Sequence, residues 1–508
     1  MDFPAAPTPK PNAELRRAAV AAAVIALALY AGMLITHVAA LPGGSDTSGY
    51  MNHARLLASG NLHAPTRAIP GLPRLAASPM LYVPLGFKPA WNGNGLVPTY
   101  PVGLPLFILA MEPIAGWRHA GDATILLHAL AGLAAMYALG RALGLSRPWA
   151  ILGTEVLALS PLYLFMSLQA MSDVPSLLWT TLAVLAALRS RGRPAWALAA
   201  GAAIAIDVLM RPTNVLAFAP LAVALGVSPR RWLLLVLGGL PGAAVFFAHN
   251  LAAYGGLAVT GYGDTGVYFG SRYVPGTLLH YARWLPVLFT PLVALDLGLP
   301  WLRTESPRTR WMLGAWIVVY AAFYAAYVCT HETWWYLRFL LPAAPALVAA
   351  ALLVARTLFG RAPAWADPGR SPTALAVALA AAALALAWPS RALHPFSIKQ
   401  EELRYRDLSG WMQANVPGDA VCLAAQVTGA LYFDTPFTFV RWEEVNKDNV
   451  GRIESAIRVA HLPLYAVLFP YEIEQFDVLR KVMPGRWIEV GKVHDIVILR
   501  RDFDAAKS

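Results

Sequence analysis

Charged side chains are scarce in this sequence. Only 14% of its 508 residues are Asp, Glu, Lys or Arg, whereas 57% are hydrophobic. A soluble globular protein usually carries roughly 25% charged residues. The deficit is concentrated in apolar blocks about 20 residues long, the length that a helix needs to cross a bilayer. The composition therefore argues against a soluble protein and predicts a polytopic membrane protein in contact with the lipid bilayer.

Cysteine is almost absent as well. The chain contains only Cys329, in an apolar segment, and Cys422, near its C-terminal end. Two isolated cysteines supply neither a disulfide framework nor the ligand spacing of a metal site. The sequence therefore gives no support to redox chemistry.

The basic residues do not form a nucleic-acid-binding surface. The net charge is +11, with 40 Lys and Arg against 29 Asp and Glu, but the basic residues stand singly or in small groups between apolar blocks. The positive-inside rule produces this distribution when those loops lie in the cytoplasm. We therefore interpret the basic residues as a signal of membrane topology, and we expect no nucleic-acid partner.

The apolar blocks predict the membrane helices. The first block, 18–40, follows Lys10, Arg16 and Arg17, and it exceeds the roughly 7–15 apolar residues of a signal peptide, so we expect an anchor with a cytoplasmic N-terminus. Further helices are expected at 122–143, 149–170, 175–189, 232–253, 282–302, 311–330, 337–358 and 372–389.

One further segment, residues 194–229, has basic clusters at both ends. Both ends should therefore face the cytoplasm, which excludes a single crossing. We expect two short helices folded back on each other near Arg211-Pro212-Thr213, because proline ends or kinks a helix. The total becomes about 11 crossings, an odd number that places the C-terminus outside.

Two segments are expected outside the membrane. Residues 41–121 form a long external loop within the membrane domain 1–397, and its apolar stretch 102–117 is short enough to lie on the surface. Residues 398–508 lack apolar blocks. Their strand patterns alternate with helical patterns at 400–415, 447–460 and 472–483, which predicts a small periplasmic α/β domain. The expected strands are Ala420–Ala424, Phe437–Val440, Leu464–Phe469 and Ile496–Leu499.

Ionisable residues near a bilayer are costly, so each is a candidate functional residue. Asp46 follows the first helix and precedes Tyr50 and Arg55, and Asp173 lies in a short external loop. Each aspartate has a structural alternative as the N-cap of the helix that follows it. Because the topology places both carboxylates on one face, we also consider acid–base chemistry.

Two other groups could bind an anion. Asp207 precedes Arg211 by four residues, a spacing that allows an ion pair within a helix, and this leaves a structural and an anion-binding role open. His331, Glu332 and Arg338 lie at the outer junction of two helices. Arg338 lies on the outer side of the membrane, where the positive-inside rule predicts few basic residues. An arginine there indicates an anionic ligand such as phosphate. One His and one Glu are too few for a zinc site.

The order and sidedness of these motifs resemble the GT-C superfamily of membrane glycosyltransferases. The likeness is greatest to the bacterial branch related to protein O-mannosyltransferases and lipid A aminoarabinose transferases. It covers roughly residues 16–360 and rests on Ser45-Asp46, Pro98-Thr-Tyr-Pro-Val-Gly-Leu-Pro105, Ser172-Asp173, Arg211-Pro212-Thr213 and Tyr336-Leu-Arg-Phe-Leu-Leu-Pro342.

The resemblance implies an all-α membrane bundle with an external tail and a catalytic role for Asp46 and Asp173. Asp46 would be the base that activates an acceptor hydroxyl, and Asp173 would position the acceptor or the base. Arg338, with Arg211, would hold the phosphate of the leaving lipid. We assign Tyr50, Arg55, His331 and Glu332 to substrate binding as well.

The expected function is inverting transfer of a hexosyl or pentosyl group from a polyprenyl-phosphate donor to a hydroxyl of a lipid, glycan or protein. The reaction would occur on the outer face of the bacterial cytoplasmic membrane without a cofactor. Many relatives carry an acidic residue where this chain has Thr47, so a divalent metal is not indicated. A secondary transporter and a non-catalytic envelope assembly protein are the alternatives.

Overall fold

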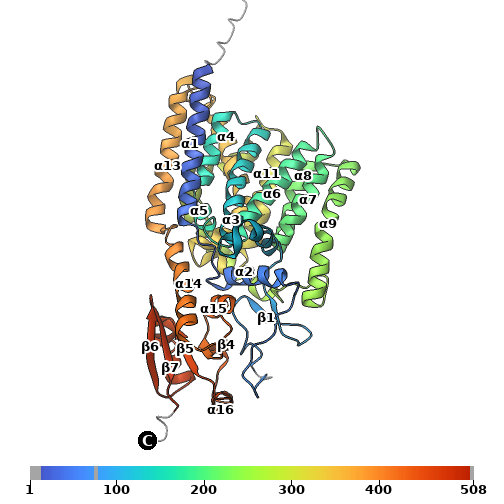
Figure 1. Ribbon diagram of the computed structural model, residues 1–508. Coiled ribbons are helices and arrows are strands. Elements are labelled where there is room, and N and C mark those ends of the chain that lie inside the picture. Colours follow the sequence, from blue (N-terminus) through green and yellow to red (C-terminus); the bar gives the residue numbers. More distant parts are fainter. Residues whose placement is uncertain (1–12, 74–77, 504–508) are drawn as a thin grey trace, which may run out of the picture.

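The computed structural model describes residues 13–73 and 78–503. Lys10 and the last five residues of the predicted domain 398–508 lie outside the described residues. Figure 1 shows a bundle of helices at one end of the molecule and a smaller domain with a β-sheet at the other. This arrangement confirms the predicted combination of a helical bundle and a C-terminal α/β unit.

Helices form wherever an apolar block predicts one. The bundle consists of α1 (Ala13–His37), α3 (Gly103–Ala142), α4 (Arg147–Leu159), α5 (Pro161–Met166), α6 (Asp173–Arg189), α7 (Trp196–Met210), α8 (Phe218–Leu225), α9 (Pro229–Tyr254), α10 (Val274–Phe289), α11 (Pro307–Ala325), α12 (Ala344–Phe359) and α13 (Pro372–Leu393). The 3₁₀ segments Pro291–Trp301 and Trp334–Ala343 lie between consecutive helices of the bundle.

Breaks divide several of the expected crossings into shorter helices. Within the described residues, four continuous helical stretches are long and apolar enough to cross a membrane, or five if a bent pair counts as one span. That pair, Ser271–Phe289 and Pro291–Trp301, is bent by 110°. Pro161 and Pro291 each follow such a break, as expected for a residue that lacks the N–H of a helical hydrogen bond.

The segment 194–229 folds back on itself as the basic clusters predict. Helix α7 ends at Met210, Arg211 is extended (φ −153°, ψ 113°), and a 3₁₀ turn over Pro212–Ala217 leads into α8. Arg191, before α7, donates hydrogen bonds to the carbonyl of Ala224 at the end of α8, one of them over 2.8 Å. The two ends of the segment therefore lie together, and Arg211 lies at the turn.

Helix α3 contains a sharp change of direction near its start. Gly116 has φ 69° and ψ 161° inside the helix, a conformation that costs little only for glycine. It separates residues 103–115 from the remainder of α3. The predicted surface stretch 102–117 is therefore distinct from the helix that follows it.

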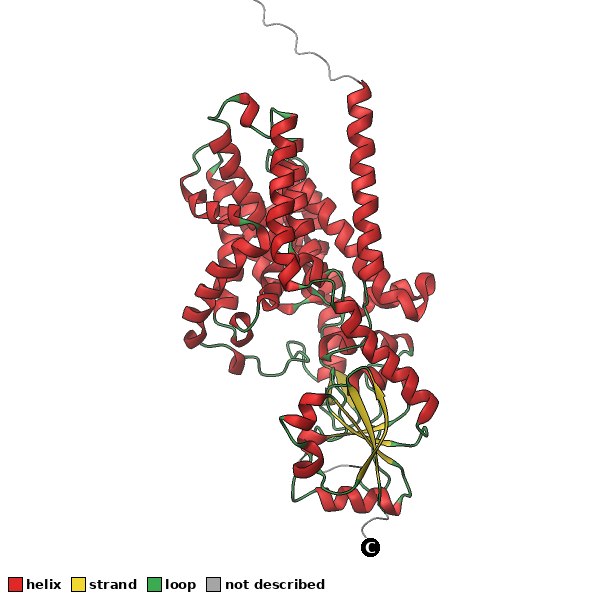
Figure 2. Ribbon diagram, turned by 90° about the vertical axis from the view of Figure 1, so that its left-hand side faces the viewer, coloured by secondary structure: helices red, strands yellow, loops and turns green. Residues whose placement is uncertain are grey.

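The C-terminal domain has one mixed sheet in the order β4-β3-β5-β7-β6. Its strands are β3 (Val421–Ala424), β4 (Thr438–Arg441), β5 (Leu464–Leu468), β6 (Trp487–Val493) and β7 (Ile496–Arg501), and its helices are α14 (Ile398–Asn415), α15 (Thr428–Asp434), α16 (Val450–Val459) and α17 (Pro470–Glu474). Strands β4, β3 and β5 are parallel, whereas β7 is antiparallel to β5 and β6. Figure 2 shows helices packed around this sheet.

Helix α2 (Ser45–Ala58) lies between the two parts of the molecule (Figure 1). It packs against α3 of the bundle and against α15 of the C-terminal domain. A small separate sheet, β1 (Phe87–Pro89) with β2 (Leu96–Pro98), precedes α3. The described residues that line the site below come from α2, from the loop after β2, from the loop after α9 and from the ends of the bundle helices nearest to the C-terminal domain.

Candidate functional site

Asp46 lies in the first turn of α2 and is held by two side chains. Its Oδ1 accepts a hydrogen bond from the Tyr100 hydroxyl over 2.5 Å, and its Oδ2 accepts one from Arg338 Nη2 over 2.8 Å. Gly44 is the N-cap of α2. The capping interpretation of Asp46 is therefore wrong, because its carboxylate is bonded to side chains from other elements.

Tyr100 reaches Asp46 because Gly49 has no side chain. A Cβ on Gly49 would lie 2.7 Å from Cε2 of the Tyr100 ring. The Tyr100 hydroxyl also lies 2.9 Å from Ser45 Oγ. Burial, and then the charge of Asp46, raise the pKa of Tyr100 well above its ordinary value. The phenol therefore stays protonated and donates to the carboxylate.

A second aspartate–arginine pair lies beside the first. Arg211 Nη2 is 2.7 Å from Asp173 Oδ1, with side chains 9% and 0% exposed. Ser172 joins this pair to α2, because its Oγ accepts hydrogen bonds from the Tyr50 hydroxyl over 3.0 Å and from Arg211 over 3.3 Å. Ser172 is also the N-cap of α6, so Asp173 does not have the capping position proposed as its alternative.

The predicted pair of Asp207 with Arg211 does not form. Asp207 accepts hydrogen bonds from the Thr180 hydroxyl and from Asn214 Nδ2, the latter over 2.6 Å. Arg211 follows the end of α7 with an extended backbone, so the spacing of four residues no longer places both side chains on one helix face. The Arg211 guanidinium instead forms an ion pair with Asp173 in the cavity.

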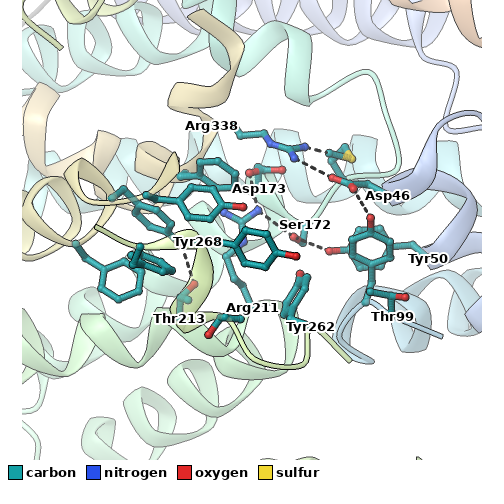
Figure 3. Close-up of a pocket in the computed structure, with 18 residues that line it drawn as sticks. Asp46, Tyr50, Thr99, Ser172, Asp173, Arg211, Thr213, Tyr262, Tyr268 and Arg338 are labelled. Atoms are coloured by element: carbon teal, nitrogen blue, oxygen red, sulfur yellow. Dashed lines mark hydrogen bonds and ion pairs between the residues drawn. The ribbon is translucent and has the colours of Figure 1, made fainter. Parts of the chain in front are cut away.

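Both ion pairs line one cavity of about 360 Å³. Figure 3 shows Arg338 next to Asp46, and Asp173 between Arg338 and Tyr268. The rest of the wall is largely aromatic, with Tyr50, Tyr100, Tyr262, Tyr268, Phe269, Phe323, Tyr324, Tyr327 and Phe339. Buried Arg211 Nη1 and Arg338 Nε have no hydrogen-bond partner among the described residues, so each guanidinium has one N–H donor that these residues leave unsatisfied.

The structure brings five predicted site residues together and leaves three elsewhere. Those that line the cavity are Asp46, Tyr50, Asp173, Arg211 and Arg338. Arg55 donates to the Phe433 carbonyl over 2.5 Å in the C-terminal domain, His331 stacks on Tyr273 with ring centroids 5.8 Å apart, and Glu332 is exposed. A part in substrate binding stays a prediction for these three.

The sequence did not single out the aromatic wall. Tyr262, Tyr268 and Phe269 belong to the loop after α9, where aromatic residues of a membrane protein are ordinarily interfacial. Gly261 brings this loop close, because a Cβ there would lie 2.5 Å from the carbonyl carbon of Thr99. Gly261 directly before Tyr262, with Tyr268 and Phe269 a few residues later, is a signal that could have drawn attention to this loop.

The donor set of this cavity does not fit a divalent cation. Within residues 13–73 and 78–503, no group of three or more His, Cys, Asp or Glu side chains is arranged to hold a metal. Both carboxylates in the cavity are already paired with guanidinium groups. Hard divalent cations take several oxygen ligands, which these two paired carboxylates do not supply.

Sequence comparison finds no matching protein family and no matching curated protein. Several solved structures have a similar fold, and three of them are described below. ArnT from Cupriavidus metallidurans, bound to undecaprenyl phosphate, aligns with a TM-score of 0.59 and 12% identity over 95% of this chain and 98% of ArnT. The other two are the apo oligosaccharyltransferase of Archaeoglobus fulgidus (TM-score 0.50, 15% identity, 89% of this chain and 69% of that one) and the mycobacterial arabinofuranosyltransferase AftD (0.51, 13%, 95% and 40%). All three belong to the GT-C superfamily, and the similarity shows that this chain has the same fold.

Proposed function

Starting from the GT-C fold, we propose that this chain is a glycosyltransferase that moves a sugar from a polyprenyl-phosphate donor to an acceptor hydroxyl. One observation carries the proposal: two Asp–Arg pairs, Asp46 with Arg338 and Asp173 with Arg211, line a single aromatic cavity. The undecaprenyl phosphate bound to the structurally similar ArnT supports a lipid-linked donor.

Asp46 acts as the general base. Its carboxylate takes the proton of the acceptor hydroxyl while the acceptor oxygen forms a bond to C1 of the sugar. The bond between C1 and the phosphate oxygen breaks in the same step, and its electron pair leaves with the polyprenyl phosphate. Attack opposite the leaving group inverts the configuration at C1.

Arg338 and Arg211 stabilise the leaving phosphate. Each guanidinium has a buried N–H without a partner among the described residues, and arginine binds phosphate oxygens with its planar fork of donors. Charge that develops on the phosphate during bond cleavage is therefore met by fixed cations, which lowers the barrier.

The tyrosines hold the sugar. Tyr50, Tyr262 and Tyr268 line the same cavity (Figure 3). An aromatic ring with a polar end suits a sugar, which has an apolar C–H face and hydroxyls at its edge. Burial raises the pKa of Tyr50 to about 12, so its hydroxyl remains a neutral hydrogen-bonding group.

We place the protein in the bacterial cytoplasmic membrane with about 11 crossings, a cytoplasmic N-terminus and a periplasmic C-terminal domain. The cavity then opens on the outer side, where a lipid, glycan or protein acceptor meets the donor. The donor carries a hexose or a pentose. The chain's own side chains carry out the reaction without a resident cofactor.

The test is transfer by the purified full-length protein in lipid nanodiscs, with radiolabelled polyprenyl-phosphate hexoses and pentoses and an extract of envelope acceptors. Wild-type protein should transfer label in the presence of EDTA. Asp46→Asn should lower the rate by about 10²–10⁴-fold, the range for loss of a general base, and should still bind polyprenyl phosphate. Asp419→Asn, at an exposed position of the C-terminal domain, is the control. Full activity of Asp46→Asn would refute the mechanism.

A further inference from the structure

Helix α2 has two faces with different partners. Asp46 and Tyr50 are four residues apart and both line the cavity. Ser48, Asn52 and Arg55 form a second stripe, which at 3.6 residues per turn lies about half a turn around the helix from the first. This second stripe, the domain face of α2, points toward the C-terminal domain.

Helix α15 of the C-terminal domain covers the domain face. Asn52 Nδ2 donates to the Gly429 carbonyl over 3.0 Å. Arg55 donates to the Phe433 carbonyl, and its guanidinium lies 3.5 Å from the centroid of the Phe433 ring. Two of the three residues of the domain face are therefore bonded to α15.

Gly429 sets how closely the two helices approach. A Cβ at this position would lie 2.7 Å from Ser48 Cβ and 2.8 Å from the carbonyl oxygen of Leu85. Real Cβ atoms do not come so near to other heavy atoms, so any larger residue at 429 must push α2 or α15 away. Thr428, the α15 residue before Gly429, accepts a hydrogen bond from the Leu85 amide over 3.0 Å. This bond keeps α15 next to Leu85.

A second contact lies at the start of α2. Glu402 of α14 is 6% exposed, and a Cβ on Gly43 would lie 2.5 Å from its Cδ and Oε1 atoms. Gly43 is three residues before Asp46. The C-terminal domain thus meets α2 both along its domain face and just before its first turn.

We propose that the C-terminal domain positions the catalytic helix. Helices α14 and α15 fix the depth and rotation of α2, and thereby place the Asp46 carboxylate against Arg338 and the acceptor. Gly429 is a positioning residue, because it touches α2 on the face opposite the cavity. The catalytic readout of this inference rests on the proposed glycosyl transfer.

The experiment compares Gly429→Ala with Gly451→Ala in the full-length protein. Each glycine is the second residue of a helix, α15 and α16 respectively, but a Cβ on Gly451 meets nothing within 4 Å. We expect Gly429→Ala to lower kcat by about tenfold or more, since a shift of about 1 Å at a reacting group costs up to about 10²-fold. The affinity for polyprenyl phosphate should stay within about twofold, and Gly451→Ala should match wild type in both.

A second pair of variants covers the case in which Gly429→Ala does not fold. The atoms nearest to a Cβ on Gly43 all belong to the Glu402 side chain. Gly43→Ala should therefore lower kcat, and the double variant Gly43→Ala/Glu402→Ala should recover it. A defect at Gly43 that does not arise from contact with Glu402 would not be rescued by shortening Glu402.

Hydrogen–deuterium exchange of the α2 amides separates this inference from the proposed function, because it needs no activity. We expect faster exchange in α2 for Gly429→Ala than for Gly451→Ala. Equal exchange and equal kcat in the two variants would overturn the positioning role even if the wild type is active. A wild type that transfers no sugar, with α2 exchange still faster in Gly429→Ala, would overturn the proposed function and leave α15 as the support of α2.

Discussion

Arg338 donates its Nη2 to Oδ2 of Asp46 over 2.8 Å, although 292 residues separate the two in the sequence. With Tyr100 on the other carboxylate oxygen, both oxygens of Asp46 have a hydrogen-bond donor. A phosphate that enters the cavity competes with Asp46 for Arg338. In the proposed reaction, Arg338, which holds Asp46, is therefore also the cation that meets the donor phosphate.

Arg338→Ala is expected to weaken binding of polyprenyl phosphate by about 10–100-fold, because hydrogen bonds to charged groups contribute about 1.5–3 kcal/mol. Arg338→Lys keeps the charge but loses the planar fork, so it should recover part of the affinity. Arg283→Ala, at an exposed position of α10, is the control. The measurement is binding of labelled polyprenyl phosphate in nanodiscs, and equal affinity of Arg338→Ala and wild type would contradict the assignment.

Tyr100→Phe removes the hydroxyl that donates to Asp46 Oδ1 and keeps the ring that packs on Gly49. Loss of one charge-assisted hydrogen bond of about 1.5 kcal/mol corresponds to about a tenfold lower kcat. The thermal midpoint should change little, because the ring still fills its place. Steady-state kinetics against Tyr137→Phe, a tyrosine outside the cavity lining, checks this, and an unchanged kcat would show that the hydrogen bond does not matter for the reaction.

Arg211→Ala should destabilise the protein strongly. It leaves Asp173, which is fully buried, without its 2.7 Å partner, and an uncompensated buried charge typically costs about 3–5 kcal/mol. Asp173→Asn in the same chain should restore much of the stability. Thermal unfolding of the two single variants and the double variant measures the coupling; strictly additive effects would mean that the pair is not coupled.

The buried histidine His53 predicts sensitivity to acid. It is fully buried with its Nε2 3.3 Å from that of His249, and burial, followed by the neighbouring histidine, lowers the pKa of His53 to about 3. The unfolded chain takes up a proton near pH 6.5 and the folded chain does not. Stability is therefore fully present above pH 6.5 and falls by about 2 kcal/mol between pH 6.5 and pH 5.

His53→Gln should flatten this dependence, whereas His461→Gln, at an exposed position, should leave it unchanged. The measurement is the thermal midpoint between pH 7 and pH 5 in the same detergent. A wild-type midpoint that does not fall with pH would contradict the prediction.

Sequence patterns predicted the parts of the fold that depend on neighbouring residues, namely the turn within 194–229 and most strands of the C-terminal domain. Basic clusters at both ends of 194–229 require a turn, and the turn lies at Arg211. The alternating strands of the C-terminal domain were predicted to within about two residues at each end, except β6 (Trp487–Val493). That strand is an exposed edge with a bulge between Glu489 and Gly491, so its residues lack the regular alternation of a half-buried strand.

Pairing between distant residues could not be predicted in the same way. Sequence spacing favours Asp207 as the partner of Arg211, but the end of α7 turns Arg211 toward Asp173. Arg55 lies on the same short helix as Asp46, yet it points to the opposite side. Which face of α2 meets the cavity depends on the elements packed around it, and residue spacing alone does not show that packing.

The contact between α2 and α15 also bears on how the protein is made. Asn52 and Gly429 are 377 residues apart, so the helix that carries Asp46 leaves the ribosome long before its partner on the C-terminal domain. Until α15 has been synthesised, Asn52 and Arg55 on the domain face of α2 lack their hydrogen-bond partners Gly429 and Phe433. Asp46, the proposed general base, is thus translated early, whereas α15, which we propose supports its helix, is translated late.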